Sequence, residues 1–430
     1  MQANEKIGEV IDRLGSAFTR LTVLRGAIET GPLSSLLALL TAAGAGDARA
    51  ASFHASRLTS ELVTCGARRV SGDLMMDFVL DTILLSDNAF ASAAAGQRLD
   101  EAVFRAMRRD LAAMRVFSEL DEDTVDRLVS ECADAKKPDT AVKLATAAWG
   151  GAVPAPTPKE RQPVPFRYDP PENCWHYGEF ELRDSFCADA ALEGMYRRFL
   201  ENDDWAELAS DLWSFHSAYG CGDFLRYRNF CLDASGALRP LPDLRAGDFV
   251  QLAEAEYGAL LNNAIAFMRD ESAKPMLLYG PQGMGKTTLM LELTDELPEL
   301  RLVLCPPSVS RQHLLDAFDR LRAQPLKFMA LLDDLNPASL TGVSEPMLPM
   351  NALVAACAPV PVLPELFEVT AELPRPQLNE FIRIVIKLLE ADQMIMNPDI
   401  VRNACVDYQV DTRCDFNVAA AVRVKELLMS

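Results

Sequence analysis

One short stretch has the residue types and the spacing of a phosphate-binding loop. Gly280-Pro281-Gln282-Gly283-Met284-Gly285-Lys286-Thr287-Thr288 reads G-x-x-x-x-G-K-T. Its glycines allow a tight turn, so that successive backbone N–H groups converge on a polyphosphate. The Lys286 ammonium would reach the β- and γ-phosphates, and the Thr287 hydroxyl would be a ligand of Mg²⁺. We therefore predict that this loop binds ATP and that Lys286 also acts in catalysis.

The residues on either side of the loop have the patterns of a strand and a helix. The apolar run 275–279 precedes it, as expected of a strand that is covered on both faces. From Thr288 to about Leu297 the pattern is helical, and the helix N-terminus adds a partial positive charge and unpaired N–H donors. A glycine-rich turn without a ligand is the alternative, and the agreement of motif and context argues against it.

Two acidic residues follow a second apolar run, 328–332. The carboxyl end of a neighbouring parallel strand faces the same crevice as the loop, so Asp333 would hold Mg²⁺ through water. Asp334 would polarise the water that attacks the γ-phosphate. A solvated turn residue is the alternative for Asp334, because Asn336-Pro337 follows it.

Strands alternate with helices around these two segments, which specifies a parallel α/β sheet. The helices at the end of the chain would form a small lid. The further elements that the periodicity predicts are strands at 302–305 and 367–373 and helices at 311–322, 378–390 and 415–429.

The rest of the chain has a helical pattern that a proline-rich stretch interrupts. Asp100 is the expected N-cap of a helix on which Arg105, Arg108, Arg109 and Arg115 form a solvated face rather than a phosphate clamp. Prolines at 154, 156, 158, 163, 165, 170 and 171 indicate a semi-rigid linker. The predicted domains are a helical N-terminal domain (1–149), the linker (150–171), a connector (172–248), the nucleotide-binding core (249–373) and the lid (374–430).

The composition is that of a globular, strongly acidic protein. The formal charge is −20, which makes nucleic acid an unlikely partner and argues against an anionic membrane surface, because both are bound by clustered Lys and Arg. The amino terminus lacks the basic segment of a secretion signal, and the run 32–46 is too short to span a bilayer. Ten scattered cysteines without a C-x-x-C pair are typical of reduced thiols. We therefore expect a cytoplasmic protein.

These motifs together resemble an AAA+-type ATPase module and, more closely, an uncharacterised bacterial ATP-binding family, domain of unknown function 815. The resemblance implies an α/β P-loop NTPase (AAA+-like) fold: a parallel sheet, a C-terminal helical lid and a large N-terminal all-helical domain. It implies a nucleotide in the crevice and no particular substrate. Besides the loop, it is carried by Ser86-Asp87-Asn88-Ala89-Phe90, Asp110-Leu111, Tyr219-Gly220, Phe224, Arg226-Tyr227, Phe230 and Leu331-Leu332-Asp333-Asp334-Leu335.

Two segments of this chain depart from the pattern of its relatives. The relatives carry a polar sensor strand between the acidic strand and the last strand, where this chain has prolines at 337, 346, 349, 359, 361 and 364. Because proline lacks a ladder donor, we expect no normal central strand there, and Asn351 is the only amide that could replace the sensor. In the lid a single arginine, Arg413, stands where relatives are more basic. It is either a γ-phosphate sensor or a solvated residue.

The leading functional hypothesis is a slow ATPase that uses Mg²⁺ and ATP to switch or remodel a protein partner. The alternative is a nucleotide-gated scaffold that binds ATP with little or no hydrolysis. A DNA-replication loader is disfavoured by the acidic charge, and a small-molecule kinase by the lack of an arginine cluster in the lid. Association into a homo-oligomer is compatible with either of the first two.

Overall fold

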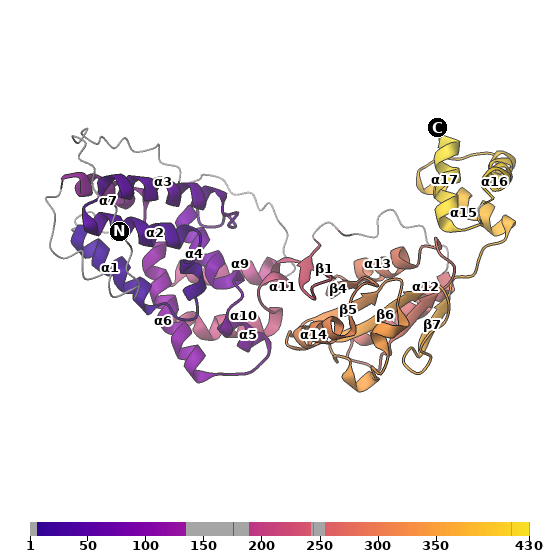
Figure 1. The fold of residues 1–430 in the computed structure, drawn as a ribbon, viewed down its shortest axis with the longest axis horizontal. Coiled ribbons are helices and arrows are strands. Elements are labelled where there is room, and N and C mark those ends of the chain that lie inside the picture. Colours follow the sequence, from indigo (N-terminus) through magenta and orange to yellow (C-terminus); the bar gives the residue numbers. More distant parts are fainter. Residues whose placement is uncertain are drawn as a thin grey trace. The chain divides into compact units, whose positions relative to one another are not determined.

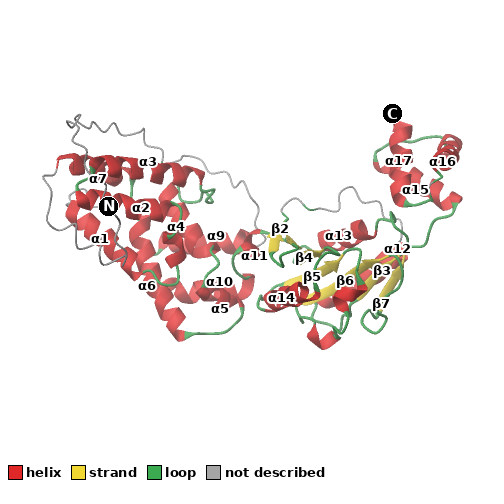
Figure 2. Cartoon of the chain, in the orientation of Figure 1, coloured by secondary structure: helices red, strands yellow, loops and turns green. Residues whose placement is uncertain are grey.

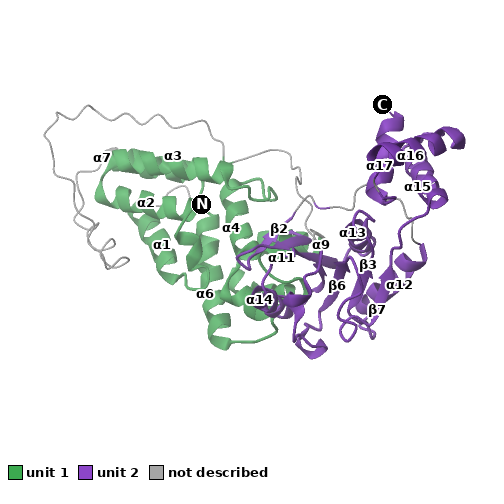
Figure 3. Cartoon of the chain, turned by 45° about the vertical axis from the view of Figure 1, so that its right-hand side comes forward, with its two compact units in different colours: residues 1–226 green, residues 227–430 purple. Residues whose placement is uncertain are grey.

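We describe a computed structural model of the chain over residues 7–134, 175, 189–241, 244, 254–413 and 415–429. It consists of two compact units, Met1–Arg226 and Tyr227–Ser430 (Figure 3). The boundary falls inside the segment 172–248, so the predicted connector contributes to both units. The predicted linker 150–171 lies outside the described residues.

The first unit is all-helical in its described residues, as predicted (Figure 2). Aspartate and asparagine side chains cap several of its helices. Asp100, for example, accepts hydrogen bonds from the N–H groups of Ala102 and Val103, which confirms the predicted N-cap. The elements are α1 (Ile7–Arg20), η1 (Arg25–Ile28), α2 (Pro32–Ala45), α3 (Ala48–Thr64), α4 (Leu74–Leu85), α5 (Ala89–Ala95), α6 (Glu101–Ser118), α7 (Glu122–Asp134), α9 (Asp189–Glu201), η2 (Trp205–Leu208), α10 (Ala209–Tyr219) and α11 (Asp223–Arg226).

A continuous hydrophobic core joins these helices, from Val10 on α1 to Leu225 on α11. Helices α9 and α10 bring Tyr196, Phe199 and Leu212 into it, so they belong to the same folded body as α1–α7. No single described helix is long and apolar enough to cross a membrane. The bent pair α4 and α5 passes by length and composition alone, and much of it lies in this core.

The second unit is built on a seven-stranded sheet of order β2-β1-β4-β5-β6-β3-β7 (Figure 1). All neighbours are parallel except β1 and β2, a hairpin that the sequence did not predict. Helices α12 and α13 pack on one face of the sheet. The elements are β1 (Asn229–Leu232), β2 (Leu238–Pro240), α12 (Glu254–Met268), β3 (Met276–Tyr279), α13 (Lys286–Glu296), β4 (Leu300–Cys305), α14 (Arg311–Arg322), β5 (Lys327–Leu332), η3 (Pro337–Leu340), η4 (Glu345–Met347), β6 (Ala352–Ala358) and β7 (Val369–Glu372).

Strand β6 corrects the expectation that no normal central strand exists in this segment. All of its residues are buried, and it pairs with β5 on one side and β3 on the other. Pro349 and Pro359 lie outside the strand, where they remove no donor from the ladder. We expected the acidic strand β5 to be the direct neighbour of β3. Strand β6 instead lies between them.

Three helices follow β7 and confirm the predicted lid. They are α15 (Leu378–Ala391), α16 (Pro398–Thr412) and α17 (Val418–Met429), and α16 was not predicted. The lid has a small core of its own, in which Phe381, Val385, Val401, Cys405 and Ala421 are fully buried. It is therefore an independently packed element at the end of the unit.

Candidate nucleotide-binding site

The predicted phosphate-binding loop connects the carboxyl end of β3 to the first turn of α13. Gly283 and Gly285 have φ of 78° and 80°, in the left-handed region that favours glycine. A Cβ on Gly280 would lie 2.3 Å from the carbonyl oxygen of Leu373, just beyond β7. The glycines are thus required by the backbone path. Pro281, Gln282 and Met284 complete the loop, and Thr288 lies in the first turn of the helix.

Lys286 is the first residue of α13 and is buried against the loop that precedes it. Its Nζ donates hydrogen bonds to the carbonyl oxygens of Gly280 and Pro281, both at 2.9 Å. The Lys286 ammonium therefore lies inside the turn formed by the glycines. From there it could make a charge-assisted hydrogen bond to a phosphate oxygen.

The acidic half of the site meets the loop directly. The Thr287 hydroxyl donates a hydrogen bond to Oδ1 of Asp333 at 2.6 Å. Both groups are oxygen donors of the kind that Mg²⁺ prefers, and such sites usually hold the ion through one or two protein ligands, water and phosphate. The described residues form no cluster of three or more His, Cys, Asp or Glu side chains, so this pair fits Mg²⁺ rather than a fully protein-ligated metal.

Asp334 forms the turn that follows β5. Its φ is 46°, a left-handed conformation that aspartate tolerates, and its side chain is exposed. The next residue, Leu335, donates its N–H to the carbonyl oxygen of Cys357 at 2.8 Å. This geometry is compatible with both roles considered for Asp334, a group that polarises water and a solvated turn residue.

Asn351 is not a sensor, which corrects that expectation. Its Nδ2 donates to the carbonyl oxygens of Leu321, Gln324 and Leu326 at 2.7–3.0 Å. It precedes β6 and therefore lies at the amino edge of the parallel sheet, opposite the edge that carries the loop. The amide ties a turn to the sheet instead.

The carboxyl end of β6 adjoins the phosphate-binding loop but brings no amide to it. The Gly280 N–H donates to the carbonyl oxygen of Ala358 at 3.1 Å, so the two segments are in contact. Residues 357–364 read Cys-Ala-Pro-Val-Pro-Val-Leu-Pro. Burial, with the charge of Asp333 as the next cause, raises the pKa of the Cys357 thiol, which keeps it protonated. The strand that we expected to be missing is thus present, and no amide side chain lies in residues 357–364 at its carboxyl end.

The lid reaches the loop through the N-terminus of α17, which the sequence analysis missed. The Ala419 N–H donates to the carbonyl oxygen of Gly283 at 3.0 Å. Asn417 caps the helix by accepting from the Ala420 N–H at 2.7 Å, and its side chain lies against Gly283. An asparagine before the apolar run of α17 is an N-cap signal that was readable in the sequence. Its contact with the loop depends on tertiary docking.

Arg413 lies at the carboxyl end of α16, four residues before Asn417 in the sequence. Its φ of 52° ends the helix, and its side chain is exposed. The neighbouring Asp415 forms an ion pair with Arg375 at 2.7 Å, across the two segments that lead into the lid helices. Within the described part of the lid, Asn417, Val418 and Ala419 contact the loop, and Arg413 does not.

Residues 224–339 match the family model described as protein of unknown function (DUF815). No curated protein matches the sequence.

Among solved structures, the chain is similar to RuvB of Thermotoga maritima, described as a Holliday junction branch migration motor. The identity is 19%, over 42% of this chain and 70% of that chain, with a TM-score of 0.28. Two single-substitution variants of the same protein match with 17% and 18% identity and TM-scores of 0.29, over the same shares of the two chains. These scores are too low to say anything about activity.

The fold of the second unit follows from its strand order and the geometry of its loop. The matched segment contains the phosphate-binding loop, Asp333 and Asp334. Residues 224–339 of this chain match the model of that uncharacterised family, and its second unit is a parallel α/β domain with a P-loop between β3 and α13.

Proposed function

We propose that the protein is a cytoplasmic, Mg²⁺-dependent ATP-binding switch that hydrolyses ATP slowly and acts on a protein partner. The observation that carries this proposal is the hydrogen bond between Thr287 and Asp333, at 2.6 Å. It joins the phosphate-binding loop to the acidic strand, so that both halves of a magnesium–nucleotide site lie at one edge of the sheet.

Each residue of the site has a distinct part in the proposed chemistry. Lys286 neutralises charge on the terminal phosphates, while Thr287 and Asp333 hold Mg²⁺, which supplies further charge neutralisation when bound. Asp334 polarises the attacking water. Hydrolysis also requires that this water be held in line, and no amide follows β6 to orient it. This loss supports slow turnover.

The contact between the lid and the loop supports a switching role. A ligand shifts a conformational equilibrium only when it interacts differently with the two states. Phosphates bound in the loop would lie beside Gly283, whose carbonyl oxygen accepts a hydrogen bond from the Ala419 N–H of the lid. Nucleotide bound in the loop would therefore change the position of the lid directly, because the lid contacts the loop itself.

A nucleotide-gated scaffold remains the second candidate, and the amide-free end of β6 favours it. In that case the same loop and lid would respond to ATP binding, with product release replaced by dissociation of intact nucleotide. The two candidates differ in phosphate release and agree in nucleotide affinity.

Isothermal titration with Mg·ATP tests whether the loop binds nucleotide. We expect the wild type to bind and Lys286→Ala to show no measurable binding, because the charge-assisted contact with the terminal phosphates is lost. Lys274→Ala is the control, since this half-buried lysine precedes β3 at the opposite edge of the sheet and pairs with Glu345 and Glu368. Equal affinity in Lys286→Ala and the wild type would remove the loop from the proposal.

A further inference from the structure

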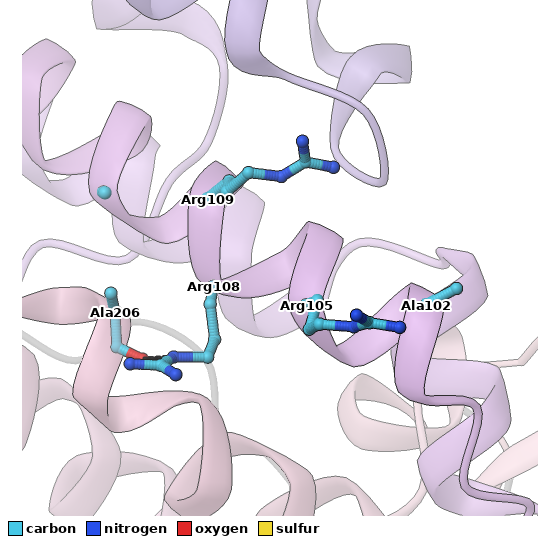
Figure 4. A pocket seen from close by; sticks show the side chains of 6 residues that line it. Ala102, Arg105, Arg108, Arg109 and Ala206 are labelled. Carbon is cyan, nitrogen blue, oxygen red and sulfur yellow. Dashed lines mark hydrogen bonds between the residues drawn. The ribbon is translucent and has the colours of Figure 1, made fainter.

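Helix α6 of the first unit lines a groove of about 650 Å³ that the nucleotide site does not explain. Three of its lining residues are arginines, and the others have short side chains (Figure 4). Residues at these spacings on α6 share one side of the helix, and the span from 102 to 112 is about 15 Å long at the usual rise per residue. The lining consists of Ala102, Arg105, Arg108, Arg109, Ala112 and Ala206.

The arginines of this groove differ from the fourth arginine of the same helix. Arg115 forms ion pairs with Glu119 and Asp203, both at 3.6 Å, and lies over the ring of Trp205. Arg105, Arg108 and Arg109 are exposed, and the described residues give none of them an acidic partner. In a chain of net charge −20, three unneutralised arginines on adjacent turns form a local reversal of sign.

Backbone contacts fix two of these side chains along the groove. Arg108 donates its Nε–H to the carbonyl oxygen of Ala206 at 3.2 Å, and Arg105 donates its Nε–H to that of Glu101 at 3.2 Å. Because these bonds use Nε, the terminal N–H groups stay available for a carboxylate. Positioned in this way, the guanidinium groups lose less side-chain entropy on binding.

The three guanidinium groups point in different directions. Arg108 reaches toward Ala206, Arg105 lies along its own helix toward Ala102, and Arg109 extends away from both (Figure 4). A compact anion such as phosphate would therefore contact one or two of them. An extended or helical segment with several carboxylates would meet all three.

We propose that this groove is a docking surface for an acidic segment of a partner protein. Arginine forms bidentate hydrogen bonds with carboxylates, and the alanines leave room for small apolar side chains between them. Three arginines on a strongly acidic chain are a poor footprint for nucleic acid or an anionic membrane. The inference names the chemistry of the partner in the proposed function, on which it rests, and it does not depend on the nucleotide site.

Fluorescence anisotropy with a labelled peptide of repeated Glu-Ala-Ala-Glu tests the proposal on the full chain. We expect the triple variant Arg105→Gln, Arg108→Gln, Arg109→Gln to bind at least about tenfold more weakly, because it loses the charge-assisted hydrogen bonds to the carboxylates. The matched control is Arg20→Gln, Arg25→Gln, Arg49→Gln, which removes the same charge from exposed arginines of the same unit. It should change the affinity by less than about twofold.

Several outcomes would overturn the proposal. They are equal weakening in the two triple variants, equal affinity for a Gln-Ala-Ala-Gln peptide, and tighter groove-dependent binding of a single-stranded oligonucleotide or of phosphatidylserine vesicles. Circular dichroism checks that each variant folds, and Arg109→Glu alone repeats the test if the triple variant does not. Mg·ATP titration of the same variants separates this surface from the nucleotide site. It should be unchanged even where the peptide no longer binds.

Discussion

At the scale of single residues, the site is defined by backbone positions as much as by charged groups. Gly280 lies so close to the chain after β7 that a Cβ would be 2.3 Å from the Leu373 carbonyl oxygen. Lys286, Thr287 and Asp333 are then placed by this fixed turn. The positions of Lys286 and Thr287 were predictable from the sequence because the motif is local and its spacing specifies the turn. That of Asp333 was predictable because it directly follows a buried apolar strand.

Replacing Gly280 with alanine should destabilise the second unit and abolish nucleotide binding. The methyl group must push the loop away from Leu373, at a cost of about 1–3 kcal/mol in the free energy of unfolding. Urea denaturation and Mg·ATP titration measure the two effects.

Gly258→Ala is the matched control for this substitution. It lies inside α12 with no atom near the added methyl group, and it should raise stability by about 0.5–1 kcal/mol. If Gly280→Ala and Gly258→Ala were both as stable as the wild type, the claim that Gly280 lies too close to Leu373 for a side chain would be contradicted.

At the scale of elements, the sequence predicted most strands and helices of the second unit and missed β6. The prolines on either side of 352–358 were counted as evidence against a strand in the whole segment. A proline weakens a strand only where it removes an N–H donor from the ladder. Pro349 and Pro359 both lie outside the ladder. Predicting β6 required noticing that Ala352–Ala358 is an uninterrupted apolar run, the pattern of a buried parallel strand.

The role of the lid could be predicted only in part. A helical lid follows from the periodicity of the last segment, and Arg413 was the natural choice for its contact with nucleotide. The structure instead brings Asn417 and Ala419 to the loop. Which end of which lid helix meets the loop depends on packing between distant parts of the chain, and no local pattern encodes it.

Asn417→Ala should therefore affect nucleotide binding more than Arg413→Ala does. Loss of the cap of α17 costs about 1 kcal/mol. Displacement of the helix end from Gly283 should weaken Mg·ATP binding about fivefold, the value of one hydrogen bond. Calorimetric titration of both variants makes the comparison. A larger loss in Arg413→Ala would assign the phosphate contact to Arg413.

At the scale of the whole molecule, the compact units do not follow the proline-rich stretch. The prolines suggested a domain boundary near residue 150, but the core of the first unit continues to Leu225. Tyr196, Phe199, Trp205 and Leu212 come from helices beyond the prolines, and all are buried in that core. A proline-rich composition does not reveal whether the residues that follow it pack into the same hydrophobic core as those that precede it.

A fragment of residues 1–226 should fold alone, and a fragment of residues 1–150 should not. The shorter fragment exposes the apolar surface that α9, η2 and α10 cover, and burial of a single large side chain is worth about 1.5–3 kcal/mol. Circular dichroism with thermal melting distinguishes them. A cooperative melt of 1–150 equal to that of 1–226 would place the boundary at the prolines after all.

The rate of phosphate release by the full chain with saturating Mg·ATP tests the proposed slow switch most directly. The site has a complete phosphate-binding loop and the Thr287–Asp333 pair, yet β6 brings no amide to orient water, and residues 335–374 contain no arginine. We predict saturable binding with turnover below about one per second, the lower end of the usual enzyme range. Turnover at or above that rate by the isolated protein would contradict the proposal.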